Sequence, residues 1–431
     1  MDSIFALASA AGRGGVAVYR LSGPKAGEAL RTLTGAELPK PRQAAFRAIS
    51  HDGELIDQGL ALWFPAPHSF TGEDVAELQL HGGRAVAQAL TEALLALGLR
   101  PAEPGEFSRR AFMAGKLDLT QAEAIADLVE AETSAQRRQA LRQMDGALYR
   151  LYEDWRDRLL RAQAHLEAEI DFSDEDLPGG LNAAARENLI DMAGEMARHL
   201  IDGHRGERLR DGLHIAILGS PNVGKSSLLN LIAGREAAIV SSQAGTTRDV
   251  IEVHLDLGGY PVVLADTAGL RETSEAIEEE GVRRARVKAE GADLKLVVLD
   301  ASQEPDPAVL ALVDEQTLVL LNKSDLSAGQ GLRGHPVSAK TGEGLDELLA
   351  ELTRRAAKTL EGSGAPALTR ARHRLALEEA VENLHHALQA TLPELVAEDV
   401  RLASRALGRI TGRVDVEDML DVIFREFCIG K

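Results

Sequence analysis

The hydrophobic positions of this chain follow three patterns, one after another. In the N-terminal part, short apolar or alternating runs end at Gly or Pro, which is typical of strands closed by turns. One stretch, 85–97, has helical spacing instead. These features predict an α+β domain over residues 1–115, with strands at 16–24, 60–67 and 75–83.

Helical spacing occupies two stretches, one on each side of the middle of the chain. Apolar residues recur three and four positions apart from Lys116 to Ile170, and again after a break at 173–180. The same spacing returns toward the C-terminus. We expect the two halves, 116–212 and 361–431, to pack together as one all-α domain.

The first of these helices carries a start signal. Thr120 and Glu123 have the spacing of a capping box, in which the hydroxyl and the carboxylate satisfy free amides of the first turn. The pattern therefore predicts that the helix is capped at Thr120.

Residues 213–360 show the third pattern. Five apolar, β-branched runs alternate here with helical spacing, which is typical of strands buried on both faces of a parallel sheet. We expect an α/β domain with a mainly parallel six-stranded sheet, inserted between the two helical halves. The fold class expected for the whole chain is multidomain α/β.

Composition narrows the possible partners and compartment. The 431 residues include 67 acidic and 48 basic side chains, for a net charge of −19, and aromatic residues make up only 3%. A chain that grips phosphate backbones by itself is usually basic, so a partner is expected to hold much of any RNA. The single cysteine excludes a disulfide framework, and no apolar run reaches the length of a membrane span. We expect a cytoplasmic protein without a membrane anchor.

Residues 219–226, GSPNVGKS, match the phosphate-binding pattern GxxxxGK[ST]. The glycines let backbone amides face phosphate oxygens, Lys225 neutralises the outer phosphates, and the Ser226 hydroxyl binds Mg²⁺. The motif follows a predicted strand and opens an apolar helix, which is the context that such a site requires. The chain is therefore predicted to bind a nucleoside triphosphate.

Three further motifs identify the base. Asn322–Asp325 reads NKSD, and its carboxylate can accept hydrogen bonds from guanine N1–H and the 2-amino group, donors that adenine lacks. Asp266–Gly269 reads DTAG, a switch that contacts magnesium through water and senses the γ-phosphate. Ser338–Lys340 reads SAK, the sequence of a base-contacting loop. Their order and spacing predict a guanine-nucleotide site in a Ras-like G domain.

The residue after the DTAG motif does not identify the group that positions the attacking water. Ras-like GTPases place a glutamine there to orient the attacking water, whereas this chain has Leu270, which cannot hydrogen-bond. Another group must position the water. From the residues alone, the candidates are Glu275, Glu278, Glu279 and Glu280.

Several longer stretches resemble one family. GRGGVAVYRLSG, FTGEDVAELQLHGG and KLDLTQAEAIADLVEA stand upstream of the phosphate-binding motif, AGTTRD and DTAGLRET follow it, and the chain ends in FCIGK. Together they resemble the MnmE (TrmE) family of tRNA modification GTPases, within the TrmE-Era-EngA-like group, along essentially the whole chain. The FTGEDxxELxxHGG stretch and the terminal CIGK are the specific parts.

This resemblance implies an activity and its partners. Members of the family are potassium-dependent GTPases that work with an FAD-containing flavoprotein, MnmG (GidA). The pair forms 5-aminomethyl or 5-carboxymethylaminomethyl uridine at the tRNA wobble position, using a formyl- or methylene-tetrahydrofolate. The N-terminal domain is implied to dimerise and to bind the folate. A homodimer and a heterotetramer with MnmG follow, with tRNA held mainly through the partner.

The resemblance also assigns site residues. The catalytic role falls on Glu278. The metal ligands are Ser226 and Thr247 for Mg²⁺, and Asn222, Ser241, Gln243 and Thr246 for K⁺. The folate contacts are Arg20, Glu77, Lys116 and Lys431. The contacts to GTP or GDP are Asn222, Val223, Gly224, Lys225, Ser226, Ser227, Ser241, Ser242, Gln243, Ala244, Gly245, Thr246, Thr247, Asp266, Thr267, Ala268, Gly269, Asn322, Lys323, Asp325, Ser338, Ala339 and Lys340.

Cys428 has two interpretations. In CIGK it matches a terminal cysteine of the family for which a catalytic role has been considered, so it is a possible catalytic residue. The alternative is a small buried hydrophobic residue on the last helix.

Two other functions stay open. A ribosome-assembly GTPase that acts as a checkpoint by binding rRNA would need a basic, KH-like appendage with a GxxG loop. The helical C-terminal block ending in FCIGK disfavours it. A folate-binding scaffold, whose G domain only controls assembly, would carry out modification without depending on GTP hydrolysis.

Overall fold

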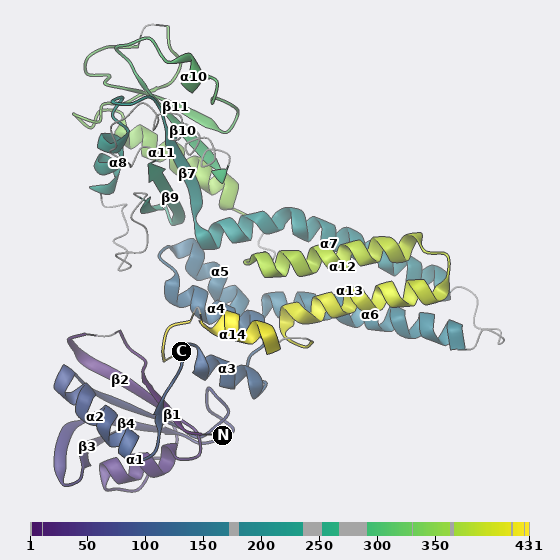
Figure 1. Ribbon diagram of the computed structural model, residues 1–431. Coiled ribbons are helices and arrows are strands. Elements are labelled where there is room, and N and C mark those ends of the chain that lie inside the picture. The colour runs from purple at the N-terminus through teal and green to yellow at the C-terminus, as the bar shows by residue number, and fades with distance from the viewer. Residues whose placement is uncertain are drawn as a thin grey trace, which may run out of the picture. The chain divides into compact units, whose positions relative to one another are not determined.

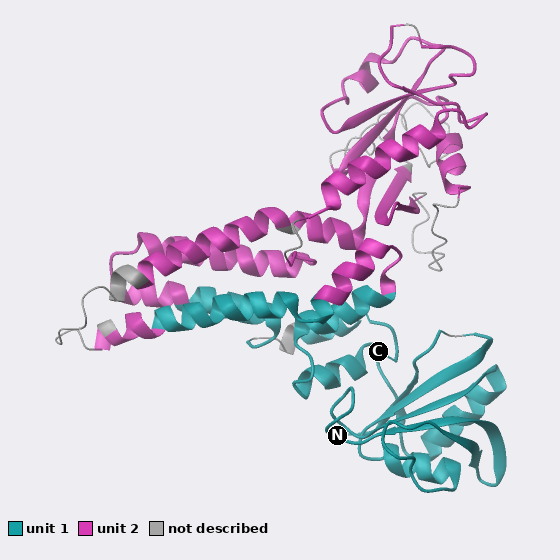
Figure 2. Ribbon diagram, turned by 180° about the vertical axis from the view of Figure 1, so that it is seen from behind, with its two compact units in different colours: residues 1–129, 143–163, 401–431 teal, residues 130–142, 164–400 magenta. Residues whose placement is uncertain are grey.

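The computed structural model describes residues 2–10, 12–171, 181–235, 252–266, 291–329, 331–362, 366–414, 417–425 and 427–430. The chain forms two compact units (Figure 2). Unit 1 contains Met1–Val129, Gln143–Gln163 and Arg401–Lys431, and unit 2 contains Glu130–Arg142 and Ala164–Val400. The domain boundaries expected from the sequence, at 115, 212 and 360, stay predictions.

Unit 1 begins with a six-stranded sheet. Its strands are β1 (Ile4–Leu7), β2 (Gly14–Ser22), β3 (Ala45–His51), β4 (Glu54–Phe64), β5 (Val75–Gly82) and β6 (Arg100–Pro101), in the order β3-β4-β5-β2-β1-β6. Helices α1 (Ala26–Thr34) and α2 (Arg84–Ala96) lie on one face (Figure 1). Because side chains alternate along a strand, Tyr19 and Leu21 of β2 are buried in the core with these helices, while Arg20 lies on the other face.

The helices of unit 1 bring distant parts of the sequence together. They are α3 (Glu106–Met113), α4 (Leu119–Glu130), α14 (Glu417–Arg425) and parts of α6 (Ala147–Asp171) and α13 (Pro393–Thr411). Leu119 and Ala122 of α4 share one apolar cluster with Phe424 and Phe427 near the chain end. The C-terminal segment is therefore part of the packing of this unit.

The start of α4 differs from the prediction. Asp118 Oδ1 accepts hydrogen bonds from the Thr120 amide at 2.8 Å and the Gln121 amide at 3.1 Å. Gln121 Oε1 in turn accepts from the Asp118 amide at 3.1 Å. The predicted cap at Thr120 was therefore wrong by two residues, because Asp118 accepts from the first-turn amides and the buried Thr120 hydroxyl donates to the same oxygen at 2.6 Å.

Unit 2 contains the second sheet. Its strands are β7 (Leu213–Leu218), β8 (Glu252–Leu257), β9 (Tyr260–Asp266), β10 (Leu294–Asp300), β11 (Thr317–Asn322) and β12 (His335–Pro336). Their order is β12-β11-β10-β7-β9-β8, and only the β8–β9 pair among the paired strands is antiparallel. The mainly parallel six-stranded sheet and the multidomain α/β class are thus confirmed. Helices α8 (Lys225–Ala233), α10 (Pro307–Leu310) and α11 (Leu345–Leu360) accompany it.

Apolar side chains cover both faces of this sheet, as expected for parallel strands. Ile215 and Ile217 of β7 belong to one cluster, with Leu348 and Leu352 of α11. Ala216 and Leu218 of the same strand belong to a second cluster on the other face. The near-continuous apolar sequence of β7 follows directly from this double burial.

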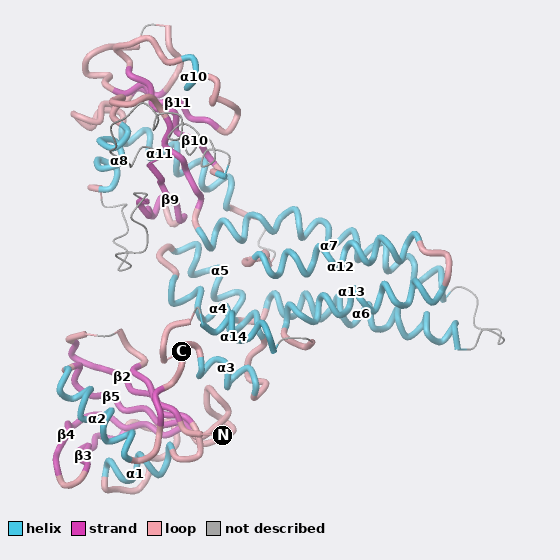
Figure 3. Tube along the Cα trace, viewed as in Figure 1, coloured by secondary structure: helices cyan, strands magenta, loops and turns pink. Residues whose placement is uncertain are grey.

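The connections into and out of this sheet run beside each other within unit 2. Helix α7 (Leu181–Asp211) leads into β7, and α12 (Ala371–Gln389), which follows the sheet in sequence, packs on α7 (Figure 3). Most of α5 (Ser134–Met144) also belongs to this unit. A Cβ on Gly206 of α7 would lie 2.0 Å from the Leu368 carbonyl oxygen, so only glycine permits this close approach. No helix in the described part of the chain is long and apolar enough to span a membrane.

Candidate functional site

The guanine-nucleotide motifs meet at one edge of the second sheet. The phosphate-binding loop follows β7, Asp266 is the last residue of β9, and Asn322 is the last residue of β11. The strand register places Ile217 opposite Asp266 and Asp300 opposite Asn322. These motifs therefore lie at the carboxyl ends of parallel strands, where α/β sheets bind their ligands (Figure 1).

The phosphate-binding loop depends on left-handed backbone conformations. Gly219, Asn222 and Gly224 have φ values of 148°, 61° and 98°. A Cβ on Gly219 would lie 2.4 Å from the Val298 carbonyl oxygen, and one on Gly224 would lie 2.2 Å from Asn322 Nδ2. The two glycines are therefore required both by the curvature of the loop and by its close neighbours.

Lys225 and Ser226 stand at the start of α8. The Lys225 ammonium donates to the carbonyl oxygens of Gly219 at 2.7 Å and Ser220 at 2.8 Å, which places its charge across the loop. Ser226 and Ser227 are exposed in the first turn of the helix. This donor set of glycine-rich backbone, ammonium and hydroxyl fits a magnesium-bound triphosphate.

Asn322 links two parts of the site. Its Nδ2 donates to the Val223 carbonyl oxygen at 2.7 Å, and its Oδ1 accepts from the Ala339 amide at 2.9 Å. The side chain is buried, so both ends of the amide are satisfied away from water. One side chain thus connects the phosphate-binding loop to the SAK loop.

Asp325 and Ser338, two residues predicted to contact the base, are hydrogen-bonded to each other. The buried Ser338 Oγ donates to Asp325 Oδ1 at 2.6 Å and also accepts from the Thr341 amide at 3.2 Å. Asp325 itself is exposed. Its carboxylate is therefore oriented by one oxygen while keeping acceptor capacity for a guanine N1–H and amino group.

The sequence analysis missed one residue of this site, Asp300. Lys323 Nζ lies 2.6 Å from its Oδ2, and Ser302 Oγ donates to its Oδ1 at 2.6 Å. Burial alone would raise the pKa of Asp300, but the hydrogen bonds from Lys323 and Ser302 outweigh it and lower the pKa. The ion pair therefore persists at neutral and mildly acidic pH. The sequence does contain a sign of this residue, because the strand-like run LKLVVLD ends in an aspartate, as PVVLAD does.

Part of the predicted set lies outside the described residues. This group comprises the switch residues Ser241, Ser242, Gln243, Ala244, Gly245, Thr246, Thr247, Thr267, Ala268 and Gly269, together with Glu278 and Lys431. Of the remaining nucleotide residues, Val223 is buried beside Asn322, and Lys340 is exposed next to the SAK serine.

The predicted folate residues Arg20 and Glu77 are direct partners in unit 1. They face each other across β2 and β5, and Arg20 Nε donates to Glu77 Oε1 at 3.0 Å. The guanidinium lies 5.5 Å from the ring centre of Phe70 and 5.9 Å from that of Phe107. Both charged side chains are partly accessible, at 23% and 16% of their surface. The pair combines an acceptor and a donor fork beside the partly accessible ring of Phe70, which suits a pterin ring.

Two further observations concern the other folate candidates. The Lys116 side chain packs beside Gly72, where a Cβ would lie 3.4 Å from its Cε. Gly430, which precedes Lys431, has φ 95°, and its Cβ would lie 2.5 Å from the Leu7 carbonyl oxygen of β1. The end of the chain thus reaches the strand that pairs with the Arg20 strand.

Cys428 is exposed and follows α14. Its carbonyl oxygen accepts from the Gly105 amide at 3.5 Å, and the next residue, Ile429, bridges to Pro104. The interpretation of Cys428 as a buried hydrophobic residue on the last helix is therefore wrong. The backbone bridge holds this segment in place while the thiol faces solvent.

Among the described residues, no three His, Cys, Asp or Glu side chains form a group that could hold a metal ion. The metal assignments therefore rest on oxygen donors around the phosphates, as in the phosphate-binding loop.

Comparison with known proteins gives matches over the whole chain. Residues 3–116 match the family model described as GTP-binding protein TrmE N-terminus, and residues 119–428 match that of the MnmE helical domain. The chain is 62% identical to a tRNA modification GTPase MnmE of Paramagnetospirillum magneticum, with 100% of both chains covered. It is 52% identical to the mitochondrial 5-taurinomethyluridine-[tRNA] synthase subunit GTPB3 of Danio rerio, covering 100% of this chain and 93% of that one.

Two solved structures each match part of the chain. The G domain of the Thermotoga maritima FeoB iron transporter is 27% identical, covers 34% of this chain and 98% of its own, and has a TM-score of 0.25. Aquifex aeolicus Era bound to GDP and AlF4⁻ is 24% identical, covers 42% of this chain and 69% of its own, and has a TM-score of 0.26.

The Asp300–Lys323 pair generates a prediction. Asp300→Asn removes the charge that fixes Lys323 beside Asn322, and we expect GDP affinity to fall about tenfold, which corresponds to about 1.4 kcal/mol. Titration with a fluorescent GDP analogue measures it. The matched control is Asp314→Asn, which breaks an ion pair of the same 2.6 Å length to Lys295, at the opposite end of β10. Equal affinities of the two variants would contradict the role given to Asp300.

Proposed function

Because the chain belongs to the MnmE (TrmE) family of tRNA modification GTPases, we propose that its GTP hydrolysis drives the formation of 5-aminomethyl or 5-carboxymethylaminomethyl uridine at the tRNA wobble position. A tetrahydrofolate one-carbon unit and an FAD-containing partner of the MnmG (GidA) type complete the reaction. GTP hydrolysis in tRNA modification follows from family membership, and the folate, the cations and the partner are the proposed refinements.

The observation that carries this proposal is the bonded framework of the nucleotide site. Asn322 joins the phosphate-binding loop to the SAK loop through bonds of 2.7 and 2.9 Å. Ser338 fixes one oxygen of Asp325 at 2.6 Å. This arrangement discriminates guanine from adenine, because an adenine would leave the oriented carboxylate without donors.

For the hydrolysis step we propose that Glu278 positions the attacking water, a role that Leu270 cannot fill. Ser226 and Thr247 would hold Mg²⁺, which neutralises charge on the outer phosphates when bound. Asn222, Ser241, Gln243 and Thr246 would hold K⁺, which would offset charge between the β- and γ-phosphates as an arginine finger does. Lys225, whose ammonium already lies across the loop, would be the third cation at the phosphates.

For the folate we propose that Glu77 accepts from the pterin N–H and amino group, and that Arg20 contacts the ligand from the neighbouring strand. Lys116 and Lys431 would bind the glutamate carboxylates. The support is the 3.0 Å pair of Arg20 and Glu77, its partial accessibility, and the approach of Gly430 to β1.

The assembly that we propose is a homodimer through the N-terminal domain, extended to a heterotetramer by the flavoprotein. The net charge of −19 disfavours strong binding of the negatively charged tRNA by this chain alone, which supports a partner that holds most of the tRNA. We propose the cytoplasm as its compartment and Cys428, whose thiol is exposed, as a candidate reactive group.

The competing function is a ribosome-assembly GTPase that binds rRNA. It requires a KH-like unit with strands after the G domain, whereas the described elements after Leu360 are the helices α12, α13 and α14. Family membership also favours tRNA modification.

Potassium dependence provides the first test. We expect steady-state GTP hydrolysis to be at least about tenfold faster in KCl than in NaCl at equal ionic strength, because the cation stabilises charge in the transition state. Asn222→Ala should remove this difference while GTP still binds. Asn230→Ala, an exposed asparagine near the other end of α8, is the matched control and should keep it. Equal rates of the unaltered chain in the two salts would contradict the potassium site.

The folate site has its own test. Glu77→Gln replaces one acceptor by a donor and breaks the charge pair with Arg20, so we expect affinity for 5-formyltetrahydrofolate to fall about tenfold or more. Calorimetric titration measures it. Glu37→Gln, on the same domain and exposed at 96% of its side chain, is the control and should bind as the unaltered chain does. Undiminished binding by Glu77→Gln would remove Glu77 from the folate site.

A further inference from the structure

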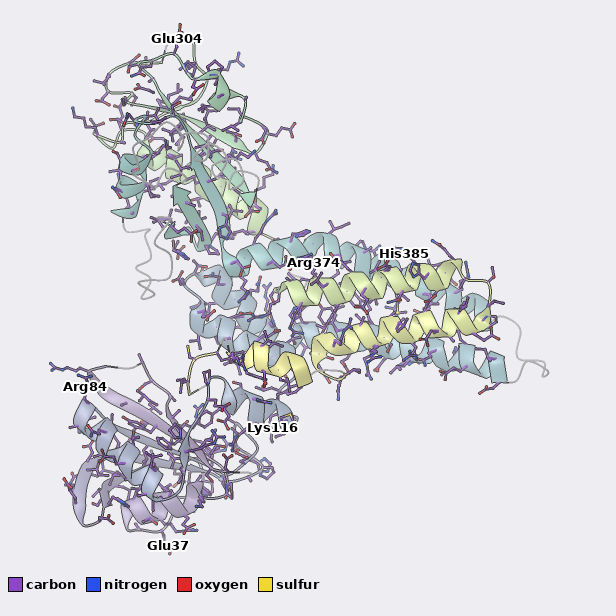
Figure 4. All side chains as sticks on the ribbon, in the orientation of Figure 1. Glu37, Arg84, Lys116, Glu304, Arg374 and His385 are labelled. Carbon is purple, nitrogen blue, oxygen red and sulfur yellow. The ribbon has the colours of Figure 1, made fainter. Side chains whose placement is uncertain are left out.

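An open recess lies at one end of β2 and β5, apart from the Arg20–Glu77 pair. It is lined by Arg13, Gly14, His81, Gly82, Gly83 and Arg84 and has a volume of about 620 Å³. Arg13, His81 and Arg84 are exposed. Figure 4 shows Arg84 projecting outward from the N-terminal part of the chain. The recess therefore presents three nitrogen-bearing side chains to solvent at one place.

Among the described residues, Arg13 and Arg84 differ from several arginines of this domain in their lack of an acidic partner, a lack that they share with Arg42 and Arg47. Arg20, Arg100 and Arg110 each pair with a carboxylate within 3.0 Å. Within the part of the chain that the structure describes, no carboxylate pairs with Arg13 or Arg84. The chain as a whole carries a net charge of −19. Two neighbouring guanidinium groups without carboxylate partners therefore make this part of the surface locally positive.

His81 is fixed in orientation by Asp57. The Asp57 carboxylate accepts from the His81 amide at 2.8 Å and lies 2.9 Å from its Nδ1. Burial alone would raise the pKa of Asp57, but these hydrogen bonds and one from Gln58 outweigh it and lower the pKa. The carboxylate is only 12% exposed, whereas His81 is 72% exposed. The carboxylate therefore holds Nδ1, and Nε2 remains on the accessible side of the ring.

Glycines form the remaining wall. A Cβ on Gly82 would lie 2.8 Å from the Gly14 carbonyl oxygen and 2.9 Å from its nitrogen, so the two strands approach this closely only without a side chain. A Cβ on Gly83 would meet nothing nearer than 4.0 Å, so there is free space beside this residue, while its amide donates to the His81 carbonyl oxygen at 2.9 Å. Two exposed arginines beside a wall of glycines are typical of a phosphate-contacting surface.

We propose that Arg13, His81 and Arg84 form a contact site for the phosphate backbone of tRNA. Arginine forks match phosphate oxygens in a bidentate manner, and such contacts fix the position of a nucleic acid without reading its sequence. The site lets an acidic chain orient the tRNA locally while a partner supplies most of the affinity. This inference rests on the proposed tRNA-modifying function.

The shape of the recess favours a polymer over a small ligand. Small-molecule sites enclose most of their ligand, whereas this recess is open and its cations are exposed. Arg20 lies six positions beyond Gly14 along β2, which places the recess about 20 Å from the folate pair. A polyanion held at several points along its length suits such an open surface.

The test is binding of fluorescently labelled tRNA to the full-length chain, measured by anisotropy over a range of KCl concentrations. The variant is Arg13→Ala with Arg84→Ala. The matched control is Arg31→Ala with Lys40→Ala, two exposed cations of the same domain, which changes the net charge equally. All proteins are also titrated with 5-formyltetrahydrofolate, and GTP hydrolysis without tRNA checks that each is folded.

We expect the Arg13, Arg84 double variant to bind tRNA about tenfold more weakly at about 0.1 M salt. Its slope of log affinity against log salt should fall by about 1.5, since two phosphate contacts are lost. The control should stay near the unaltered chain. Equal losses in both double variants, or a loss of folate binding with tRNA binding intact, would overturn the inference alone. Absence of tRNA binding by the unaltered chain would overturn the inference, whereas the proposed function, in which the partner holds most of the tRNA, fails only if no modified wobble uridine forms when the flavoprotein is present.

Discussion

The nucleotide site depends on one buried amide, that of Asn322. Its two hydrogen bonds join the loop after β7 to the loop after β12, which lie far apart in the sequence. The Cβ space of Gly224 is taken by this same side chain, so glycine is required there by Asn322 as well as by loop curvature. A buried amide with an unsatisfied end costs about 1–3 kcal/mol, which makes the two loops mutually dependent. Asp325 and Lys323 are oriented within this framework.

Much of the architecture could be predicted from local patterns, and the failures have physical causes. Apolar runs of strands buried on two faces identify β7 and β10, and GxxxxGK[ST] identifies the phosphate loop because its glycines are dictated by backbone geometry. The cap of α4 was misplaced because the sequence has the capping-box spacing twice, at Asp118 with Gln121 and at Thr120 with Glu123, and the helix is capped by the first. Asp300 was missed because its role depends on the ion pair with Lys323, which only the pairing of neighbouring strands brings close.

The N-terminal domain shows the same limit more strongly. Arg20 and Glu77 are separated by 57 residues, and nothing local indicates that β2 and β5 make them neighbours. Without the family resemblance, the sequence would predict that both are ordinary charged residues on the surface. The same two strands end in the glycine-lined recess of Arg13 and His81, so a single strand pair carries the folate candidates along its length and the proposed tRNA contact at its end. Unpaired arginines in an acidic chain were visible only once the ion pairs of their neighbours were known.

The central claim is that GTP hydrolysis drives the modification of tRNA. The most direct measurement is the content of modified wobble uridine, by nucleoside mass spectrometry, in tRNA incubated with the flavoprotein partner, folate, GTP and either Glu278→Ala or Glu275→Ala. We predict that Glu278→Ala binds GTP but loses both hydrolysis and modification, while Glu275→Ala retains both. Modification at the normal level by a variant that binds GTP without hydrolysing it would contradict the account and leave the G domain as a device for assembly.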